Sequence, residues 1–480
     1  MNPKLLCGSK YNGELTGQTW DVLDDENLAN YFRLTDTHIR EYGSPDIFHT
    51  IGLAERSFST DTEVNMRLKL YVYRRICSYL KEKYPNAPLL IASWDLWGWF
   101  TSENVNRLLS ELDPEQSIIL DYTSDTKCES NFTTWGVVGK FPWIFGMFGG
   151  YEADSDIRGF YDWTNERIRI AKDDPMCRGV VLWPETSHSD TLMTEYLAKN
   201  AWEQDTLSVE DLVKTYCSDR YSAANAERMH GIWKDFMPIV QMRSWNPVNS
   251  CNMAWGQDTF VRIADRAKFD GKPFRYYGRD PEDGAAHREQ AVRVLRALAE
   301  TVPDDEMLRR DVCDIARTVL GRYVDCCVRL AEVRYSAGGD GMEDAMEAAL
   351  ALMRALCGVY ASHSDYSPLE TLRGLRRVTA VAPDFETTLK HNASGHYCRS
   401  HIRENAFYLY LPEMEILFDE VKKAVRANAE IDREAIRTRM EQNMQRYLET
   451  PLEEMRCGQQ ADLRTLLADA AGVIEHTKFI

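Results

Sequence analysis

Short apolar runs alternate with longer amphipathic segments over the first 200 residues. Five runs have the length and β-branched content of buried strands, and they cover residues 47–53, 89–93, 118–120, 142–148 and 179–183. Between them, apolar residues recur at helical spacing in residues 25–42, 61–83, 102–112 and 155–172. Strands that alternate with helices in this way predict βαβ units and a parallel sheet. We therefore predict an α/β fold, part of a (β/α)8 TIM-like barrel.

The pattern changes after about residue 205. Residues 191–202, 209–216 and 223–241 have helical spacing, and after a loop at 244–252 nearly all of the remaining chain does. Further helices are predicted over residues 281–300, 306–335, 342–362, 369–380, 401–427 and 432–449. We predict two domains, a partial (β/α) barrel over residues 1–205 and an all-α C-terminal domain over residues 206–480.

Polar or aromatic residues follow each predicted strand. They are Glu55, Trp94 with Asp95, Asp121, Tyr151 and Glu185. The carboxyl ends of parallel barrel strands lie at one face, where barrel enzymes place their active sites. The sequence therefore predicts a site at that face.

Glu55 and Glu185 are the strongest candidates for a pair of catalytic residues. Each is a single carboxylate directly after an apolar strand, and 130 residues separate them. Two carboxyl groups on different strand ends can converge on one bond, where one donates a proton and the other attacks or activates water. The alternative is that both are solvated loop glutamates.

Tryptophans are dense at the predicted strand ends. They are Trp94, Trp97, Trp99, Trp143 and Trp183. Aromatic faces stack on the apolar faces of sugar rings, so this density favours a carbohydrate-binding cleft, with core packing as the alternative.

Several polar side chains are candidates for contacts with sugar hydroxyls. Asp95, Asp121, Asp190 and Tyr151 are such candidates, although a lone aspartate is often a helix cap or turn residue. His188, three residues after Glu185, is a candidate ligand to a hydroxyl, with a surface loop position as the alternative. His49 falls inside the first predicted strand, and we expect it to be a core histidine.

Composition narrows the class of partner. The 480 residues include 44% hydrophobic and 28% charged residues, typical of a globular protein, and the formal net charge is −18. This charge disfavours nucleic acid and anionic membranes as partners and favours a neutral or cationic substrate. No apolar run reaches the ~20 residues of a membrane span. No signal sequence is visible, so we predict a cytoplasmic location if Met1 is the true start.

The cysteines and histidines do not form a metal motif. The twelve cysteines include no Cys-x-x-Cys pair, and the ten histidines do not cluster in the sequence. Glycine-rich stretches lack the context of a phosphate-binding loop. We predict no metal and no cofactor.

The order of motifs from about Val22 to Tyr221 resembles glycoside hydrolase family 89, the α-N-acetylglucosaminidases. The resemblance is carried by DENLANYFRLTDTHIREYG with FHTIGLAE, by LLIASW and IILDY, by FPWIFGMFGG, and by WPETSHSDTLMTEYLAKNAW. It implies that Glu55 is the catalytic acid/base and Glu185 the nucleophile. It also implies a two-glutamate retaining mechanism without cofactors.

The sequence departs from the family pattern at two places. Ala54 stands where the family has asparagine before its acid/base, and residues 186–190 read Thr-Ser-His-Ser-Asp instead of the family's Gly-x-x-Gln-Asn. We expect contacts near the scissile sugar to differ from those of the family.

Only five of the eight barrel strands are predicted. Family members carry the other βα units ahead of the region that resembles this chain. We therefore expect the chain to be the C-terminal part of a longer enzyme, in which case the cytoplasmic prediction loses its basis.

These observations predict a retaining exo-α-glycosidase acting on terminal α-linked N-acetylglucosamine or a related sugar. Two alternatives stay open. One is a catalytically inactive carbohydrate-binding remnant. The other is half of a split glycosidase that assembles with an upstream barrel fragment or as a homo-oligomer.

Overall fold

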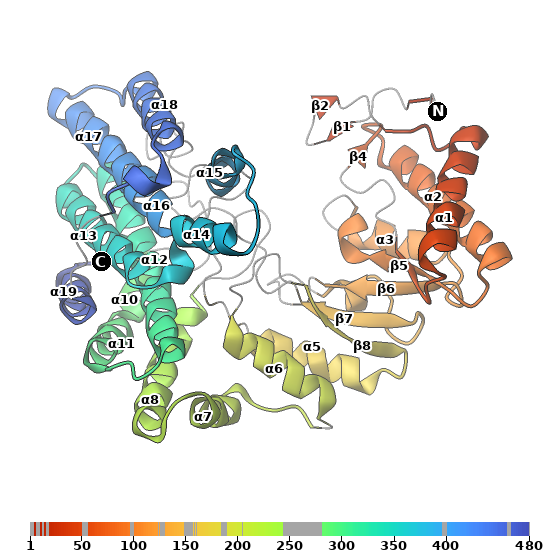
Figure 1. Ribbon diagram of the computed structural model, residues 1–480, viewed down its shortest axis with the longest axis horizontal. Coiled ribbons are helices and arrows are strands. Elements are labelled where there is room, and N and C mark those ends of the chain that lie inside the picture. Colours follow the sequence, from red (N-terminus) through yellow and green to blue (C-terminus); the bar gives the residue numbers. More distant parts are fainter. Residues whose placement is uncertain are drawn as a thin grey trace. The chain divides into compact units, whose positions relative to one another are not determined.

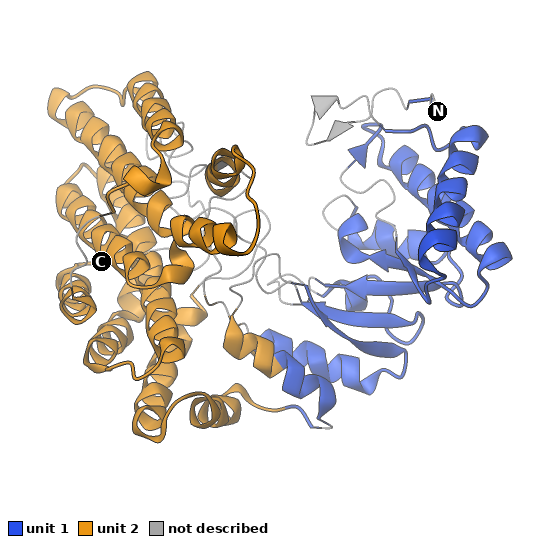
Figure 2. Ribbon diagram, viewed as in Figure 1, with its two compact units in different colours: residues 1–148, 162–183, 197–206 blue, residues 149–161, 184–196, 207–480 orange. Residues whose placement is uncertain are grey.

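The computed structural model describes sixteen stretches of the chain. They are residues 4–5, 10–11, 14–15, 19–49, 56–96, 100–122, 124, 130–147, 157, 159, 161–183, 190–203, 205–242, 281–395, 401–457 and 462–479. The chain divides into two compact units (Figure 2). Unit 1 comprises residues 1–148, 162–183 and 197–206, and unit 2 comprises residues 149–161, 184–196 and 207–480.

A five-stranded parallel sheet organises unit 1. Its order is β3 (Phe48–His49), β5 (Leu89–Ala92), β6 (Ser117–Asp121), β7 (Trp143–Met147) and β8 (Cys177–Leu182). Each of the five predicted strands therefore occurs, and each pairs in parallel with its neighbour in this order. A smaller antiparallel sheet joins β1 (Lys10–Tyr11) to β2 (Glu14–Leu15) and to β4 (Arg56–Ser57).

Helices connect the parallel strands, and Figure 1 shows α5 running alongside β8. They are α1 (Asp25–Tyr42), α2 (Thr62–Lys83), α3 (Ser102–Leu109), α4 (Asn131–Thr134), α5 (Tyr161–Asp173) and α6 (Thr191–Trp202). Local chemistry sets the ends of α1 and α2. The side chains of Asp24 and Asp61 accept backbone N–H groups of the first turns, and Gly43 ends α1 at a φ of 96°.

The sheet core explains why the strands are apolar. All four residues of β5 are buried, and Ile119 and Phe145 on the next two strands are fully buried. These central strands are covered on both faces, so a continuous apolar run replaces the alternation of a half-exposed strand. The expectation that residues 179–183 form a buried strand is wrong, because no residue of β8 is buried.

Unit 2 is helical. Its helices after residue 206 are α7 (Val209–Arg220), α8 (Ala223–Val240), α10 (Pro281–Ala286), α11 (Arg288–Glu300), α12 (Glu306–Ser336), α13 (Met342–Ala361), α14 (Pro368–Val378), α15 (Phe385–Gly395), α16 (Arg403–Asn405), α17 (Leu411–Ala427), α18 (Arg433–Glu449) and α19 (Leu463–His476). Short 3-10 turns occur at Ser93–Asp95 in unit 1 and at Ser364–Tyr366 and Leu452–Glu454 in unit 2. The sequence analysis did not delimit α15 and α19.

Helix α12 passes through the core of unit 2 and carries a buried arginine. The guanidinium of Arg322 donates to the carbonyls of Ile239 (2.9 Å) and Val240 (3.3 Å) at the end of α8. It also donates to the carbonyl of Ile157 (2.7 Å). These bonds satisfy carbonyls that the end of α8 leaves without helical partners.

The predicted helix over residues 401–427 is interrupted. A π-helical turn, Ala406–Tyr410, lies between α16 and α17. Pro412 has no N–H to donate to the carbonyl of Tyr408 four residues earlier, and the side chain of Asn443 donates to that carbonyl instead (2.9 Å).

The prediction of an α/β barrel-like domain followed by a helical region is confirmed. The boundary at residues 205 and 206 stays a prediction. None of the described helices has the length and apolar content needed to cross a membrane.

Candidate active site at the strand ends

The parallel sheet brings the carboxyl ends of its strands to one edge. His49 is the last residue of β3, Asp121 the last of β6, and Trp183 directly follows β8. Of the predicted site residues, Glu55, Tyr151, Glu185 and His188 lie outside the described residues, as do Trp97 and Trp99. Their roles stay predictions.

Three aromatic side chains meet at this edge, and we call them the aromatic trio: His49, Tyr122 and Trp183. The rings of Tyr122 and Trp183 are stacked, with centroids 5.8 Å apart and planes at 19°. The ring of His49 meets Trp183 edge-on, with centroids 6.5 Å apart and planes at 78°. Since β3 and β8 are the two outer strands of the sheet order, this contact requires the sheet to curve as barrel strands do.

The backbone of Tyr122 is held by the neighbouring strands. Its N–H donates to Oγ of Ser93, directly after β5, at 3.4 Å. A Cβ atom at Gly146 of β7 would lie 2.6 Å from Cα of Tyr122, so this approach requires glycine. The position of the Tyr122 backbone is therefore set by contacts with Ser93 and with β7.

A buried polar cluster lies under the end of β5. Nζ of Lys69, on α2, donates to the backbone carbonyl (2.6 Å) and the carboxylate (3.3 Å) of Asp95. The hydroxyl of Tyr73 donates to the other carboxylate oxygen. Burial raises the pKa of Asp95 to about 6, although Lys69 and Tyr73 act in the opposite direction. Burial also lowers the pKa of Lys69, so the cluster is a supporting structure.

Trp94 lies within the 3-10 turn that this cluster anchors. Its side chain is half-buried, between the buried Ser93 and Asp95. A partly exposed indole at a strand end is consistent with the predicted contact to substrate, which stays a prediction.

Asp121 and Asp190, which we predicted as contacts for sugar hydroxyls, accept hydrogen bonds at the starts of helices. A helix cap was the alternative role that we gave for each. Asp121 accepts from the backbone N–H of Phe132 (3.1 Å) and from the side chain of Asn131 (3.4 Å) in α4. Asp190 accepts from the backbone N–H of Met193 (3.0 Å) in the first turn of α6. Both carboxylates are buried. These contacts account for both residues without a ligand.

Trp143 occupies the opposite end of its strand. It is the first residue of β7 and is fully buried, and its indole N–H donates to Asp174 (2.8 Å). Its ring stacks on Phe132, with centroids 4.5 Å apart. This arrangement offers no free ring face to a sugar, so we leave Trp143 out of the proposed site.

The expectation that His49 is a core residue is wrong. Its side chain is exposed, although burial by its neighbours still lowers its pKa. Sequence reasoning also missed Tyr122 as a site residue. Its position directly after a predicted strand is the signal that had marked Trp94.

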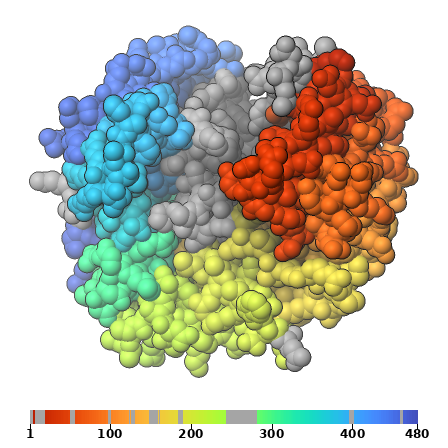
Figure 3. All heavy atoms as spheres, turned by 45° about the vertical axis from the view of Figure 1, so that its right-hand side comes forward, coloured from red at the N-terminus to blue at the C-terminus, as the bar shows by residue number. Residues whose placement is uncertain are grey.

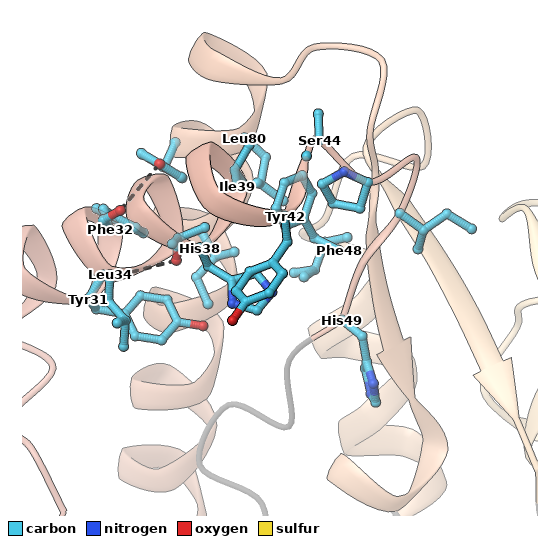
Figure 4. Close-up of a pocket in the computed structure, with 17 residues that line it drawn as sticks. Tyr31, Phe32, Leu34, His38, Ile39, Tyr42, Ser44, Phe48, His49 and Leu80 are labelled. Carbon is cyan, nitrogen blue, oxygen red and sulfur yellow. Dashed lines mark hydrogen bonds between the residues drawn. The ribbon is translucent and has the colours of Figure 1, made fainter.

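A groove of about 570 Å³ opens between α1, α2 and β3. It is lined by apolar and aromatic side chains, including Tyr31, Phe32 and Tyr42, which is 81% exposed. Figure 4 shows the ring of His49 directed away from these side chains, and Figure 3 shows the face on which α1 lies at the surface. His49 is also one of the residues that line this groove.

Among the described residues, no group of three or more His, Cys, Asp or Glu side chains could hold a metal ion.

Comparison with known proteins gives a match to a family model and matches to solved structures. Residues 26–204 match the model of the α-N-acetylglucosaminidase (NAGLU) tim-barrel domain. No curated protein matches the chain. The predicted resemblance to glycoside hydrolase family 89 is confirmed.

Solved structures of a family 89 glycoside hydrolase from Clostridium perfringens share the fold. The complex with PUGNAc has a TM-score of 0.67 at 13% identity, and the complex with 2-acetamido-1,2-dideoxynojirmycin 0.68 at 14%. A variant with two glutamates replaced by glutamine, in complex with its substrate GlcNAc-α-1,4-galactose, has 0.67 at 13%. Each match covers 95% of this chain and 51% of the other, so the chain spans about half the length of these relatives.

Proposed function

We propose, from the premise that this chain is an α-N-acetylglucosaminidase-like protein of glycoside hydrolase family 89, that it hydrolyses terminal α-linked N-acetylglucosamine or a related sugar with retention of configuration. Glu55 protonates the leaving oxygen and then deprotonates water. Glu185 attacks the anomeric carbon and forms a glycosyl-enzyme intermediate.

The observation that carries this proposal is the contact between His49 and Trp183. Glu55 follows His49 by six residues, and Glu185 follows Trp183 by two. The ring centroids of His49 and Trp183 are 6.5 Å apart, so side chains at the ends of the two strands that precede these glutamates in the sequence meet. A retaining pair requires carboxyl groups about 5–5.5 Å apart, and we propose that Glu55 and Glu185 form such a pair.

The substrate class rests on the relatives. The Clostridium perfringens enzyme was captured with GlcNAc-α-1,4-galactose after two of its glutamates had been replaced by glutamine. Two glutamates and a neutral sugar are what we propose here, and the net charge of −18 is compatible with a neutral substrate. Ala54 and residues 186–190, which depart from the family pattern, are the positions where we expect preference among related sugars to be decided.

The test is hydrolysis of an aryl α-N-acetylglucosaminide by the chain and three variants. We expect Glu185→Gln to abolish turnover while sugar binding survives, and Glu55→Gln to lower turnover by about 10²–10⁴-fold. Glu111→Gln is the matched control, because Glu111 is an exposed glutamate paired with Arg74 on the surface of unit 1. Proton NMR of the first sugar released should show the α-anomer.

Retained turnover in Glu185→Gln would remove Glu185 as nucleophile, and release of the β-anomer would indicate inversion. A carbohydrate-binding protein without turnover is the second candidate. It is favoured by the five-stranded sheet of the described residues, since a closed barrel of this type has eight strands. Binding of N-acetylglucosamine by calorimetry without hydrolysis would support it.

A further inference from the structure

We propose that Trp183 is the stacking platform for the apolar face of the bound sugar, and that Tyr122 and His49 are positioning residues that fix the plane of its ring. This inference rests on the proposed function and adds to it the residues that orient the sugar. It concerns three side chains of unit 1 that come from the ends of β3, β6 and β8.

The contacts leave one face of the indole available. Tyr122 is 8% exposed and stacks at 19° against Trp183, which covers one face of the indole. His49 meets the indole edge-on at 78°. Trp183 is nevertheless 45% exposed, so the accessible surface is the face opposite Tyr122 together with part of the rim.

An indole whose ring plane is fixed by neighbouring side chains binds a ligand more strongly than one that rotates freely. Ordering a side chain on binding costs conformational entropy, and this cost is avoided where the ring plane is already set. Two neighbours from different strands restrict Trp183, and Tyr122 is itself restrained by Ser93 and by its close approach to Gly146.

The chemistry of the trio fits a neutral pyranose. One face of the sugar ring presents C–H bonds, and an aromatic face attracts such partial positive charge. The trio contains no carboxylate and no permanent cation, and burial lowers the pKa of His49, which keeps its imidazole neutral at neutral pH. An uncharged ring face suits an uncharged sugar.

The same contacts have another interpretation, in which Trp183 is a surface side chain packed on Tyr122. In that case its exposed face has no ligand, and substitutions would change stability and leave binding intact. The two interpretations differ in what they predict for ligand affinity and for the fluorescence of Trp183.

The experiment measures binding of N-acetylglucosamine by calorimetry and by tryptophan fluorescence in the full chain. We expect Trp183→Ala to weaken binding about tenfold, and Trp183→Phe to weaken it by a smaller factor. Tyr122→Ala and His49→Ala should each weaken binding about three- to tenfold, whereas Tyr122→Phe, which keeps the stacked ring, should bind as the wild type does. Trp202→Ala is the control, because Trp202 is 90% exposed and lies outside the trio.

The readouts separate orientation from general damage. Circular dichroism and thermal unfolding verify that each variant is folded. Saturating sugar should change the fluorescence of the wild type and not that of Trp183→Phe. Rescue by Tyr122→Phe identifies the ring of Tyr122, and not its hydroxyl, as the positioning element.

Several results would overturn the inference: wild-type affinity in Trp183→Ala, an identical fluorescence change in Trp183→Phe, or no sugar binding by the wild-type chain. Failure of the proposed function gives a different result, namely sugar binding that depends on Trp183 without hydrolysis. Conversely, hydrolysis with a KM unchanged by Trp183→Ala would reject the platform and leave the glycosidase proposal standing.

Discussion

Replacing Lys69 by methionine tests the buried cluster that supports the end of β5. The change removes a cation whose Nζ lies 2.6 Å from the backbone carbonyl of Asp95 and 3.3 Å from its carboxylate. Methionine keeps most of the apolar stem in place. Asp95 is fully buried, so its carboxylate cannot turn to water for compensation.

The magnitude follows from the pKa of Asp95, which burial raises from 3.8 to about 6. At about 1.36 kcal/mol per pKa unit, keeping Asp95 ionised at pH 7 already destabilises the native state by about 3 kcal/mol. Without Lys69 the pKa rises further, and at pH 7 the carboxyl can take up a proton. Protonation limits the total penalty to about 4.4 kcal/mol, which is about 1.4 kcal/mol more than in the wild type.

Loss of the hydrogen bonds from Nζ adds to this electrostatic part. Hydrogen bonds to charged groups contribute about 1.5–3 kcal/mol, so we expect Lys69→Met to destabilise unit 1 by about 3–4 kcal/mol at pH 7. An acid whose folded pKa is raised is destabilising above that pKa; this penalty decreases as pH falls below the folded pKa of about 6 and is lost only below the unfolded pKa of 3.8. The destabilisation by Lys69→Met should therefore shrink by about 1.4 kcal/mol between pH 7 and pH 5.

Hydrogen exchange measured by mass spectrometry on peptides from residues 62–95 is the assay, because two compact units need not unfold together. The double variant with Asp95→Asn removes the unpaired charge and should recover about half of the loss at pH 7. Lys81→Met is the control: Lys81 is on α2, its side chain is 64% exposed, and it pairs with Asp113 at 3.8 Å. It should change the opening free energy by less than about 0.5 kcal/mol.

A loss below about 1 kcal/mol at pH 7 would refute the reasoning, since breaking a buried pair usually costs about 3–5 kcal/mol. A loss that is larger at pH 5 than at pH 7 would also refute it, because it would give the pKa of Asp95 the wrong sign. Failure of Asp95→Asn to restore any stability would show that the carboxylate is not the source of the penalty.

Two further predictions concern residues packed against the site. Gly146→Ala places a Cβ atom 2.6 Å from Cα of Tyr122, so thermal unfolding should show that the protein loses about 1–3 kcal/mol of stability. Calorimetry should show weaker binding of N-acetylglucosamine. Unchanged binding would mean that the position of Tyr122 does not depend on this close approach. Trp143→Phe removes the indole N–H that donates to the buried Asp174, so the free energy of unfolding should fall by about 1–3 kcal/mol. The KM for the aryl glycoside should stay unchanged. A raised KM would indicate that Trp143 belongs to the substrate-binding site.

The helices and strands of unit 1 were predictable because their signals are local. Apolar runs and helical spacing located each parallel strand, and Asp25–Tyr42 and Thr191–Trp202 were predicted to the residue. The order of family motifs pointed to the same fold. Where a predicted helix was interrupted, as before α17, the cause was a proline and a side chain from another helix, Asn443.

The site was less predictable, because a strand-end position does not say where a side chain points. Trp143 was counted among the tryptophans at strand ends that favour a sugar-binding cleft, but it lies buried at the amino end of β7, bonded to Asp174 31 residues away. Asp121 and Asp190 look the same in the sequence whether they bind a ligand or cap a helix. His49 was expected in the core, since the curvature that exposes it is not encoded in the pattern of its own strand.

The sequence by itself determined the order of strands and helices and the two glutamates that follow apolar strands. Periodicity and capping act over a few residues, so they can be recognised without the fold. Only the tertiary structure decided that His49 meets Trp183, that Lys69 meets Asp95, and that Tyr122 lies against Gly146. These contacts depend on how the sheet curves and on which residues distant in the chain share one volume, and no local pattern specifies either.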